Sequence, residues 1–90
     1  MNNEIFLKKC EELVREYTLD HLDKSDPEVD FKVFVAWSCK TLQNNKALLS
    51  TTLFDGMYYE VTYNGDKKEL YLDAYKKWEN RCIKVEESDK

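Results

Sequence analysis

The side chains best suited to chemistry in this chain are three cysteines and one histidine, and their spacing builds no recognised site. Cys10, Cys39 and Cys82 are odd in number and widely separated, with no C-x-x-C pair. A structural zinc site takes about four cysteine or histidine ligands, and His21 is the single histidine available. We therefore predict no metal site and no cofactor, and we interpret the cysteines as three buried, reduced thiols.

A second group that could do chemistry lies near the end of the first predicted helix. Asp20, His21 and Asp23 are close in sequence and could form an acid–base pair. Adjacent residues do not share a helix face, however, and a histidine near a helix C-terminus complements the helix dipole. A nucleophilic cysteine would need His21 beside it in space, and nothing in the spacing brings the two together. We therefore expect that the protein is not an enzyme.

Length and composition fit one small domain. The chain has 90 residues, 42% of them hydrophobic and 36% charged, with two glycines and one proline. We predict a single domain over residues 1–85 and a frayed tail over 86–90. No apolar run approaches the roughly 20 residues that span a bilayer, and the first residues lack the pattern of a secretion signal. We expect a cytoplasmic protein without membrane contact.

The charge gives no overall attraction for nucleic acid. The formal net charge is −4, and acidic and basic residues are interleaved. This balance is too mild for a DNA mimic and has the wrong sign for binding phosphate. The basic pairs Lys67-Lys68 and Lys76-Lys77 are interpreted as solvated side chains.

The elements begin with an amphipathic helix from Asn3 to about Leu22. Asn2 or Asn3 can cap its start. A polar segment over residues 24–30, which contains Pro27, then separates the helix from the strands. The apolar stripe of the helix follows the spacing i, i+4, i+7, i+8 and i+11, and comprises Phe6, Cys10, Leu13, Val14 and Tyr17.

From residue 31 the apolar pattern changes to period two, which predicts β-strands. Asn44-Asn45-Lys46 and Phe54-Asp55-Gly56 are expected to form three-residue hairpin loops, with Gly56 at a position that needs a positive φ. These loops keep the odd-numbered residues on one face through three strands. The odd face of the first strand comprises Phe31, Val33, Val35, Trp37 and Cys39.

Apolar residues change from odd to even positions across Asn64-Gly65. Met57, Tyr59, Val61 and Tyr63 precede this dipeptide, and Leu70, Leu72 and Ala74 follow it. A two-residue loop pairs Tyr59 with Leu70 on one face and Tyr58 with Tyr71 on the other, and a four-residue loop gives the same parity. We predict an α+β fold, with the N-terminal helix packed on an antiparallel four-stranded meander.

One alternative concerns the segment after this turn. Asp66–Glu69 has the spacing of a capping box, and Leu70, Ala74 and Trp78 fit a helical stripe. The resulting order of helix, three strands and helix resembles that of double-stranded-RNA-binding domains. We prefer a fourth strand, because Leu72 falls off the stripe and Lys67-Lys68 would oppose the helix dipole. A short final strand is expected around residues 81–85.

The sheet face opposite the helix is predicted to carry apolar side chains among polar ones. Tyrosine and phenylalanine are enriched at protein interfaces, so this face is a candidate surface for a partner protein or for a homodimer. Stacking of single-stranded bases on its tyrosines is a second alternative. The predicted binding residues are Phe34, Leu42, Leu48, Phe54, Tyr58, Tyr71 and Tyr75.

Two segments, Trp37–Thr52 and Gly56–Lys67, carry a resemblance that extends over nearly the whole chain. They resemble a family of small, uncharacterised proteins encoded by phages and prophages of low-GC Gram-positive bacteria. That family has no assigned activity, so the resemblance transfers no site residues. It implies a cytoplasmic accessory protein that binds a host or defence-system protein, in the manner of a host-takeover or anti-defence inhibitor.

Overall fold

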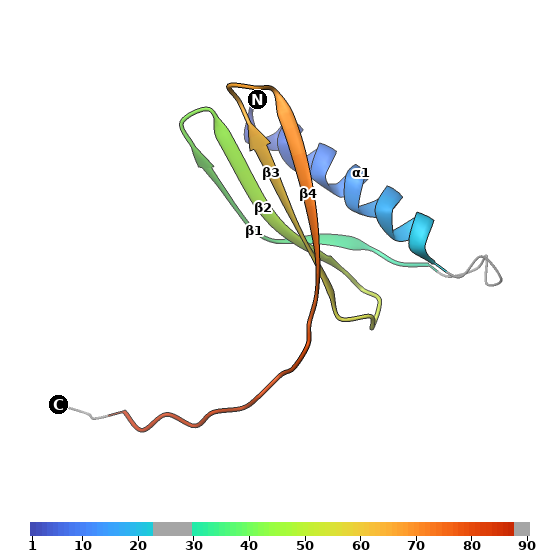
Figure 1. Cartoon of the computed structure of the whole chain (residues 1–90), viewed down its shortest axis with the longest axis vertical. Helices are drawn as coiled ribbons and strands as arrows, with labels where there is room; N and C mark the ends of the chain where they lie inside the picture. Colours follow the sequence, from blue (N-terminus) through green and yellow to red (C-terminus); the bar gives the residue numbers. More distant parts are fainter. Residues whose placement is uncertain (23–29, 88–90) are drawn as a thin grey trace.

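The computed structural model describes residues 1–22 and 30–87, which form one helix and one four-stranded sheet (Figure 1). Helix α1 spans Asn3–His21, and the strands are β1 (Val33–Thr41), β2 (Asn44–Thr51), β3 (Met57–Asn64) and β4 (Glu69–Lys76). The sheet is antiparallel with the order β1-β2-β3-β4. The predicted helix and four-stranded meander are therefore confirmed, and the segment after Asn64-Gly65 is a strand rather than a second helix. The polar segment with Pro27 lies outside the described residues.

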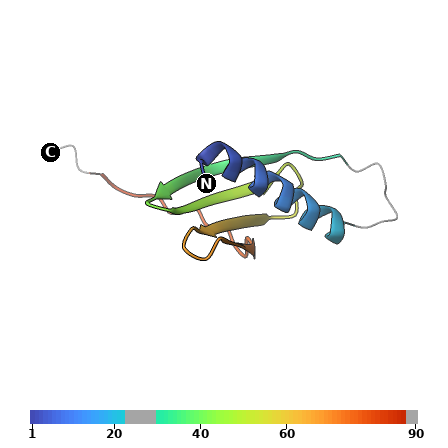
Figure 2. The same ribbon diagram turned by 90° about the horizontal axis from the view of Figure 1, so that it is seen from above.

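Helix α1 begins where the sequence predicts and turns the predicted stripe to the core, with Phe6, Cys10 and Val14 buried and Leu13 and Tyr17 partly buried. The Asn2 side chain caps the helix by accepting the Ile5 N–H at 2.9 Å. Figure 2 shows the helix on one side of the sheet, where it contacts β1, β2 and β3. The buried core between the two layers comprises Phe6, Cys10, Val14, Ala47, Leu49, Tyr59, Val61 and Tyr63. Removing a side chain the size of Val14, Leu49 or Phe6 from water stabilises the fold by about 1.5–3 kcal/mol.

The first hairpin differs from the prediction because β1 contains a β-bulge. Val35 lies opposite Leu49 and Trp37 lies opposite Leu48, so Ala36 is an extra residue between them. The turn is Leu42-Gln43, not Asn44-Asn45-Lys46, since Thr41 pairs with Asn44. This register places Val33 and Val35 beneath α1. After the bulge the odd residues of β1 change face, so the predicted position of Trp37 on the helix side is wrong.

The two later connections keep the predicted parity with different lengths. Residues 52–56 connect β2 to β3 in place of the predicted three-residue loop, and Leu49 lies opposite Tyr59. Gly56 has the expected positive φ, at 70°. Residues 65–68 connect β3 to β4, and Tyr63 lies opposite Leu70. The four-residue alternative is therefore the observed one. Leu70 and Leu72 still pack against the core.

Two further expectations about the chain need correction. Cys10 is buried, but Cys39 and Cys82 are exposed, so the three thiols do not share one environment. Residues 81–85 form no strand within the described part of the chain. Instead, the residues after β4 run away from the sheet (Figure 1). Among the described residues, no helix has both the length and the apolar character that crossing a bilayer requires.

Candidate functional site

The open face, which we define as the sheet surface opposite α1, carries large apolar side chains from all four strands. Neighbouring residues of a strand point to opposite sides of a sheet. The residues that alternate with the core residues along each strand therefore lie on the open face. Phe34, Trp37, Tyr71 and Tyr75 are each between 45% and 52% exposed on it. Its apolar members are Phe34, Trp37, Leu48, Tyr58, Tyr71 and Tyr75.

Cross-strand pairing brings some of these side chains together in an order that differs from the prediction. Tyr58 lies opposite Tyr75, and Tyr71 lies opposite Thr62, so the expected Tyr58–Tyr71 pair does not form. The cause is the four-residue β3–β4 loop, which shifts the register relative to a two-residue turn. Trp37 lies opposite Leu48 on the same face, near the β1 edge of the sheet. Apolar pairs therefore sit near both edges of the open face.

Charged side chains separate these apolar groups. Lys46 Nζ lies 3.5 Å from Glu60 Oε1 across β2 and β3, and Asp73 lies opposite Glu60 on β4. The Tyr71 hydroxyl donates to the Glu69 carboxylate, and this hydrogen bond raises the pKa of Tyr71. The open face therefore carries acidic groups, whose charge opposes the binding of phosphates, between its apolar side chains.

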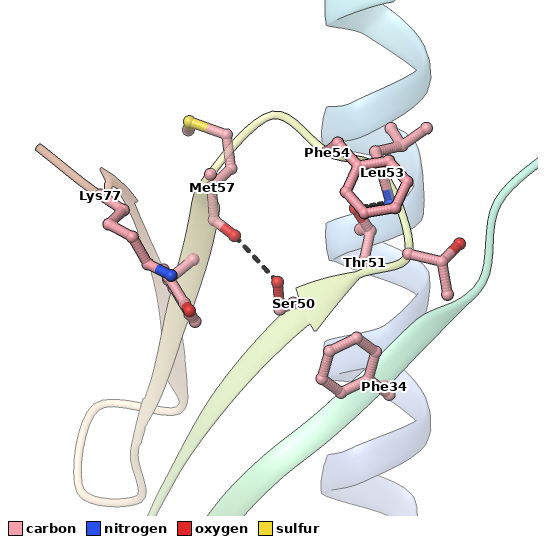
Figure 3. A pocket seen from close by; sticks show the side chains of 10 residues that line it. Phe34, Ser50, Thr51, Leu53, Phe54, Met57 and Lys77 are labelled. Atoms are coloured by element: carbon pink, nitrogen blue, oxygen red, sulfur yellow. Dashed lines mark hydrogen bonds between the residues drawn. The ribbon is translucent and has the colours of Figure 1, made fainter. Parts of the chain in front are cut away.

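A hollow of about 450 Å³ lies at the end of the open face nearest the β2–β3 loop. Figure 3 shows Phe34 on one wall, Lys77 on the other and Ser50 between them. The Ser50 hydroxyl donates to the Met57 carbonyl at 2.9 Å, and the Lys77 ammonium lies 5.6 Å from the centre of the Tyr58 ring. The hollow therefore offers aromatic walls and one cation–π pair.

Two of the predicted binding residues lie in loops, Phe54 where the sequence predicts it and Leu42 in a turn instead of on a strand. Phe54 belongs to the β2–β3 loop, lines the hollow and is fully exposed. Leu42 lies in the β1–β2 turn with a φ of 56° and is 84% exposed. The prediction missed Trp37, because the bulge that turns it outward has no signal in the alternating pattern. It also missed Lys77, which it had grouped with solvated basic pairs.

The residues near the end of α1 are engaged in structural contacts. His21 Nδ1 lies 2.8 Å from the Tyr17 carbonyl oxygen, and the two rings stack 4.1 Å apart. They line a hollow of about 220 Å³ with Asp55, whose carboxylate accepts the Met57 N–H. Asp23 lies outside the described residues. No group of three metal-binding side chains occurs in the part of the chain that the structure describes.

Comparison with known proteins places the chain in a family without assigning an activity. No curated protein and no solved structure matches it. A family model described as a family of unknown function (DUF6275) matches residues 7–85, which include α1 from its second turn and all four strands. The chain therefore belongs to the DUF6275 family of unknown function.

Proposed function

We propose that this chain is a non-enzymatic accessory protein that binds another protein through its open face. The observation that carries the proposal is the set of half-exposed aromatic side chains on a sheet surface that no second layer covers in the described chain. Aromatic residues provide large contact areas with few rotatable bonds, so they dominate the binding energy of many interfaces. The interleaved Lys46, Glu60 and Asp73 then give the surface its specificity.

The proposed setting is the cytoplasm of a bacterial host during phage infection or prophage carriage. The resemblance of Trp37–Thr52 and Gly56–Lys67 to phage and prophage proteins supports this setting. The proposed partner is a host or defence-system protein, which the chain would inhibit by covering its surface. Because the open face is part acidic, the complementary surface should combine apolar groups with lysine or arginine.

Quantitative co-purification from the bacterial host tests this proposal. Phe34→Ser combined with Trp37→Ser removes two apolar groups from the open face, and Lys8→Ser combined with Glu12→Ser changes exposed residues of α1 as the matched control. We expect the first variant to lose the partner at least tenfold, which corresponds to about 1.4 kcal/mol, and the control to retain it. Equal recovery by both variants would show that the open face is not the binding site.

Nucleic-acid binding is a distinct outcome of the same measurement. The described chain has a strand, β4, where the order of a double-stranded-RNA-binding domain would have a helix, which favours the protein partner over this alternative. If single-stranded nucleic acid instead stacked on Tyr58 and Tyr75, nucleic acid would co-purify, and its binding would weaken steeply with salt. That result would replace the proposed protein partner.

A further inference from the structure

Residues 78–87 form an extended arm that has no neighbour within the described chain. The last backbone contact between β3 and the end of β4 is the Lys77 N–H, which donates to the Gly56 carbonyl at 2.7 Å. Beyond it every residue of the arm is exposed, and Figure 1 shows the segment leaving the sheet. Trp78, Ile83 and Val85 are 94%, 75% and 76% exposed. Large apolar side chains gathered on a short exposed segment indicate a surface that another molecule covers.

The strand from which the arm leaves has a free edge. β4 pairs only with β3 among the described strands. In an antiparallel ladder, successive residues direct their backbone groups alternately to one neighbour and to the other. Since Lys77 bonds to Gly56, the odd-numbered residues of β4 face β3, and the N–H and C=O groups of Leu72 and Ala74 point to the free edge. A free edge of this kind is a template for one more strand.

We propose that the arm and the free edge of β4 pair reciprocally with β4 and the arm of a second copy of this chain. The two copies would form one continuous antiparallel sheet across a two-fold axis. This inference goes beyond the proposed function, because it uses the edge of the sheet and leaves both open faces accessible.

The alternation of the arm matches the alternation of β4. Ile83 and Val85 have the odd parity of Tyr71 and Tyr75, and Cys82 has the even parity of Leu72. Residues directly opposite each other in an antiparallel pair lie on the same face. A register that pairs odd with odd residues therefore sets apolar residues of the arm beside apolar residues of β4, both on the open face and on the α1 side of the sheet. The same register brings the edge-facing backbone groups of the even residues together.

Charge complementarity selects one register of this parity. With Lys77 on the two-fold axis, Asp73 of each copy faces Arg81 of the other, Tyr71 faces Ile83 and Leu72 faces Cys82. Moving the axis to Trp78 would instead set Asp73 against Ile83 and Lys77 against Glu79, but the Lys77 ammonium already lies over the Tyr58 ring. The two Lys77 side chains meet at the axis, but each ammonium lies over the Tyr58 ring of its own copy.

The arm is poorly suited to folding back on its own sheet. No glycine or proline follows Lys76 in the sequence, and within residues 78–87 Asn80 is the one residue of a type that favours tight turns. In the structure it continues away from β4 instead of reversing. A second copy of the protein has the same free β4 edge, and the arm can pair with that edge.

A disulfide trap tests the register directly. In a chain that carries Cys39→Ser and Cys82→Ser, Lys77→Cys would place two thiols at a non-hydrogen-bonded pair whose Cα atoms lie about 4.5 Å apart, within disulfide range. We expect mild oxidation to give a covalent dimer. Asp73→Cys in the same background is the control, because the two copies of residue 73 would lie about 26 Å apart along the strands.

Sedimentation of the full chain tests the pairing without a cross-link. We expect a dimer, with its affinity reduced about tenfold by Arg81→Asp and restored when Asp73→Arg is added, since the pair occurs twice in each dimer. A monomer at every concentration would overturn the inference, as would a dimer in which Lys77→Cys fails to cross-link. Partner binding through the open face is measured separately, so the two proposals can fail independently.

Discussion

At the scale of single residues, two adjacent asparagines of β2 have opposite energetic roles. Asn44 Oδ1 accepts the Gly65 N–H at 3.0 Å. This hydrogen bond connects two hairpin ends, the β1–β2 turn and the β3–β4 loop. Asn45 is 1% exposed, and neither polar atom of its side chain has a hydrogen-bond partner among the described residues. A buried polar group without a partner costs about 1–3 kcal/mol. Asn45 therefore lowers the stability of the fold, whereas Asn44 raises it.

Replacing Asn45 by a side chain of similar shape should relieve this cost. We expect Asn45→Leu to raise the free energy of unfolding by about 1–2 kcal/mol, because leucine buries apolar atoms where the amide leaves polar ones unpaired. Asn44→Leu is the matched control and should lower it by about 1 kcal/mol. Urea denaturation measures both changes. A lower midpoint for Asn45→Leu would show that the fold depends on the amide.

The buried thiol of Cys10 predicts a loss of stability in alkali. Burial in the core, assisted by the nearby Glu11 carboxylate, raises the pKa of Cys10 from its ordinary value of 9.0 to about 12. The folded state therefore keeps the proton while the unfolded state releases it. The resulting stability is fully present below pH 9 and is lost as the pH rises from 9 to 12.

Comparison with Cys10→Ala isolates this effect. Burial also raises the pKa of Tyr59, but that contribution is common to both chains. We expect the free energy of unfolding to fall more steeply between pH 9 and 12 in the natural sequence than in Cys10→Ala. Urea titrations at several pH values measure the two slopes. Equal slopes would contradict the assignment of Cys10 to the core.

At the scale of elements, the sequence pattern was sufficient for the strands and insufficient for their register. The helix, four strands and the odd-to-even change after Tyr63 are local periodicities, so they could be predicted. The bulge at Ala36 could not, since one extra residue leaves no mark in the residue types. The turn at Leu42 was also hidden, because leucine seldom adopts its φ of 56° and the adjacent asparagines seemed better turn residues.

The bulge turns Trp37 to the open face, which predicts a small stability cost when this residue is replaced. Because Trp37 lies on the open face, Trp37→Ser should lower the free energy of unfolding by less than about 1 kcal/mol, the scale of a cross-strand pair. Leu49→Ala in the core is the control and should cost about 2–5 kcal/mol. Chemical denaturation compares the two variants. If Trp37→Ser lowered the free energy of unfolding as much as Leu49→Ala does, the Trp37 side chain would lie beneath α1.

Gly65 has a different structural role from the one that its neighbour Asn64 suggests. The Asn-Gly pair predicts a tight turn with positive φ, but Gly65 instead lies against Gln43, where an added Cβ would come within 2.1 Å of the Gln43 carbonyl oxygen. The Asn64 side chain accepts the N–H groups of Asp66 and Lys67 and stabilises the longer loop. Close contact between the two hairpin ends therefore explains the glycine.

Alanine at this position should be more costly than at the other glycine. We expect Gly65→Ala to lower the free energy of unfolding by about 3 kcal/mol, because the obstructing atom belongs to the backbone. Gly56→Ala should cost about 1 kcal/mol through its positive φ. Since the clash is with the carbonyl oxygen, Gln43→Ala should not rescue Gly65→Ala. Equal costs for the two alanine variants would show that the hairpin ends are not in close contact.

At the scale of the whole molecule, the two sides of the sheet differ in what covers them. Helix α1 and the core residues occupy one side and hold the strands in register. The other side presents Phe34, Trp37, Tyr71 and Tyr75 half-exposed. The alternation of apolar and polar residues alone was enough to predict that the face opposite the helix carries exposed apolar side chains. Its pairing and the position of Trp37 could not, because they depend on loop lengths and on one bulge.

Site-specific photo-cross-linking in the proposed bacterial host shows which surface of the protein a partner contacts. A benzophenone amino acid is placed at Trp37 or Tyr71 on the open face, and at Glu12 or Glu16 on the exposed side of α1 as controls. We predict that the open-face positions capture one and the same host protein and that the α1 positions do not. Capture of that protein from the α1 positions alone would contradict the assignment of the open face as the binding surface.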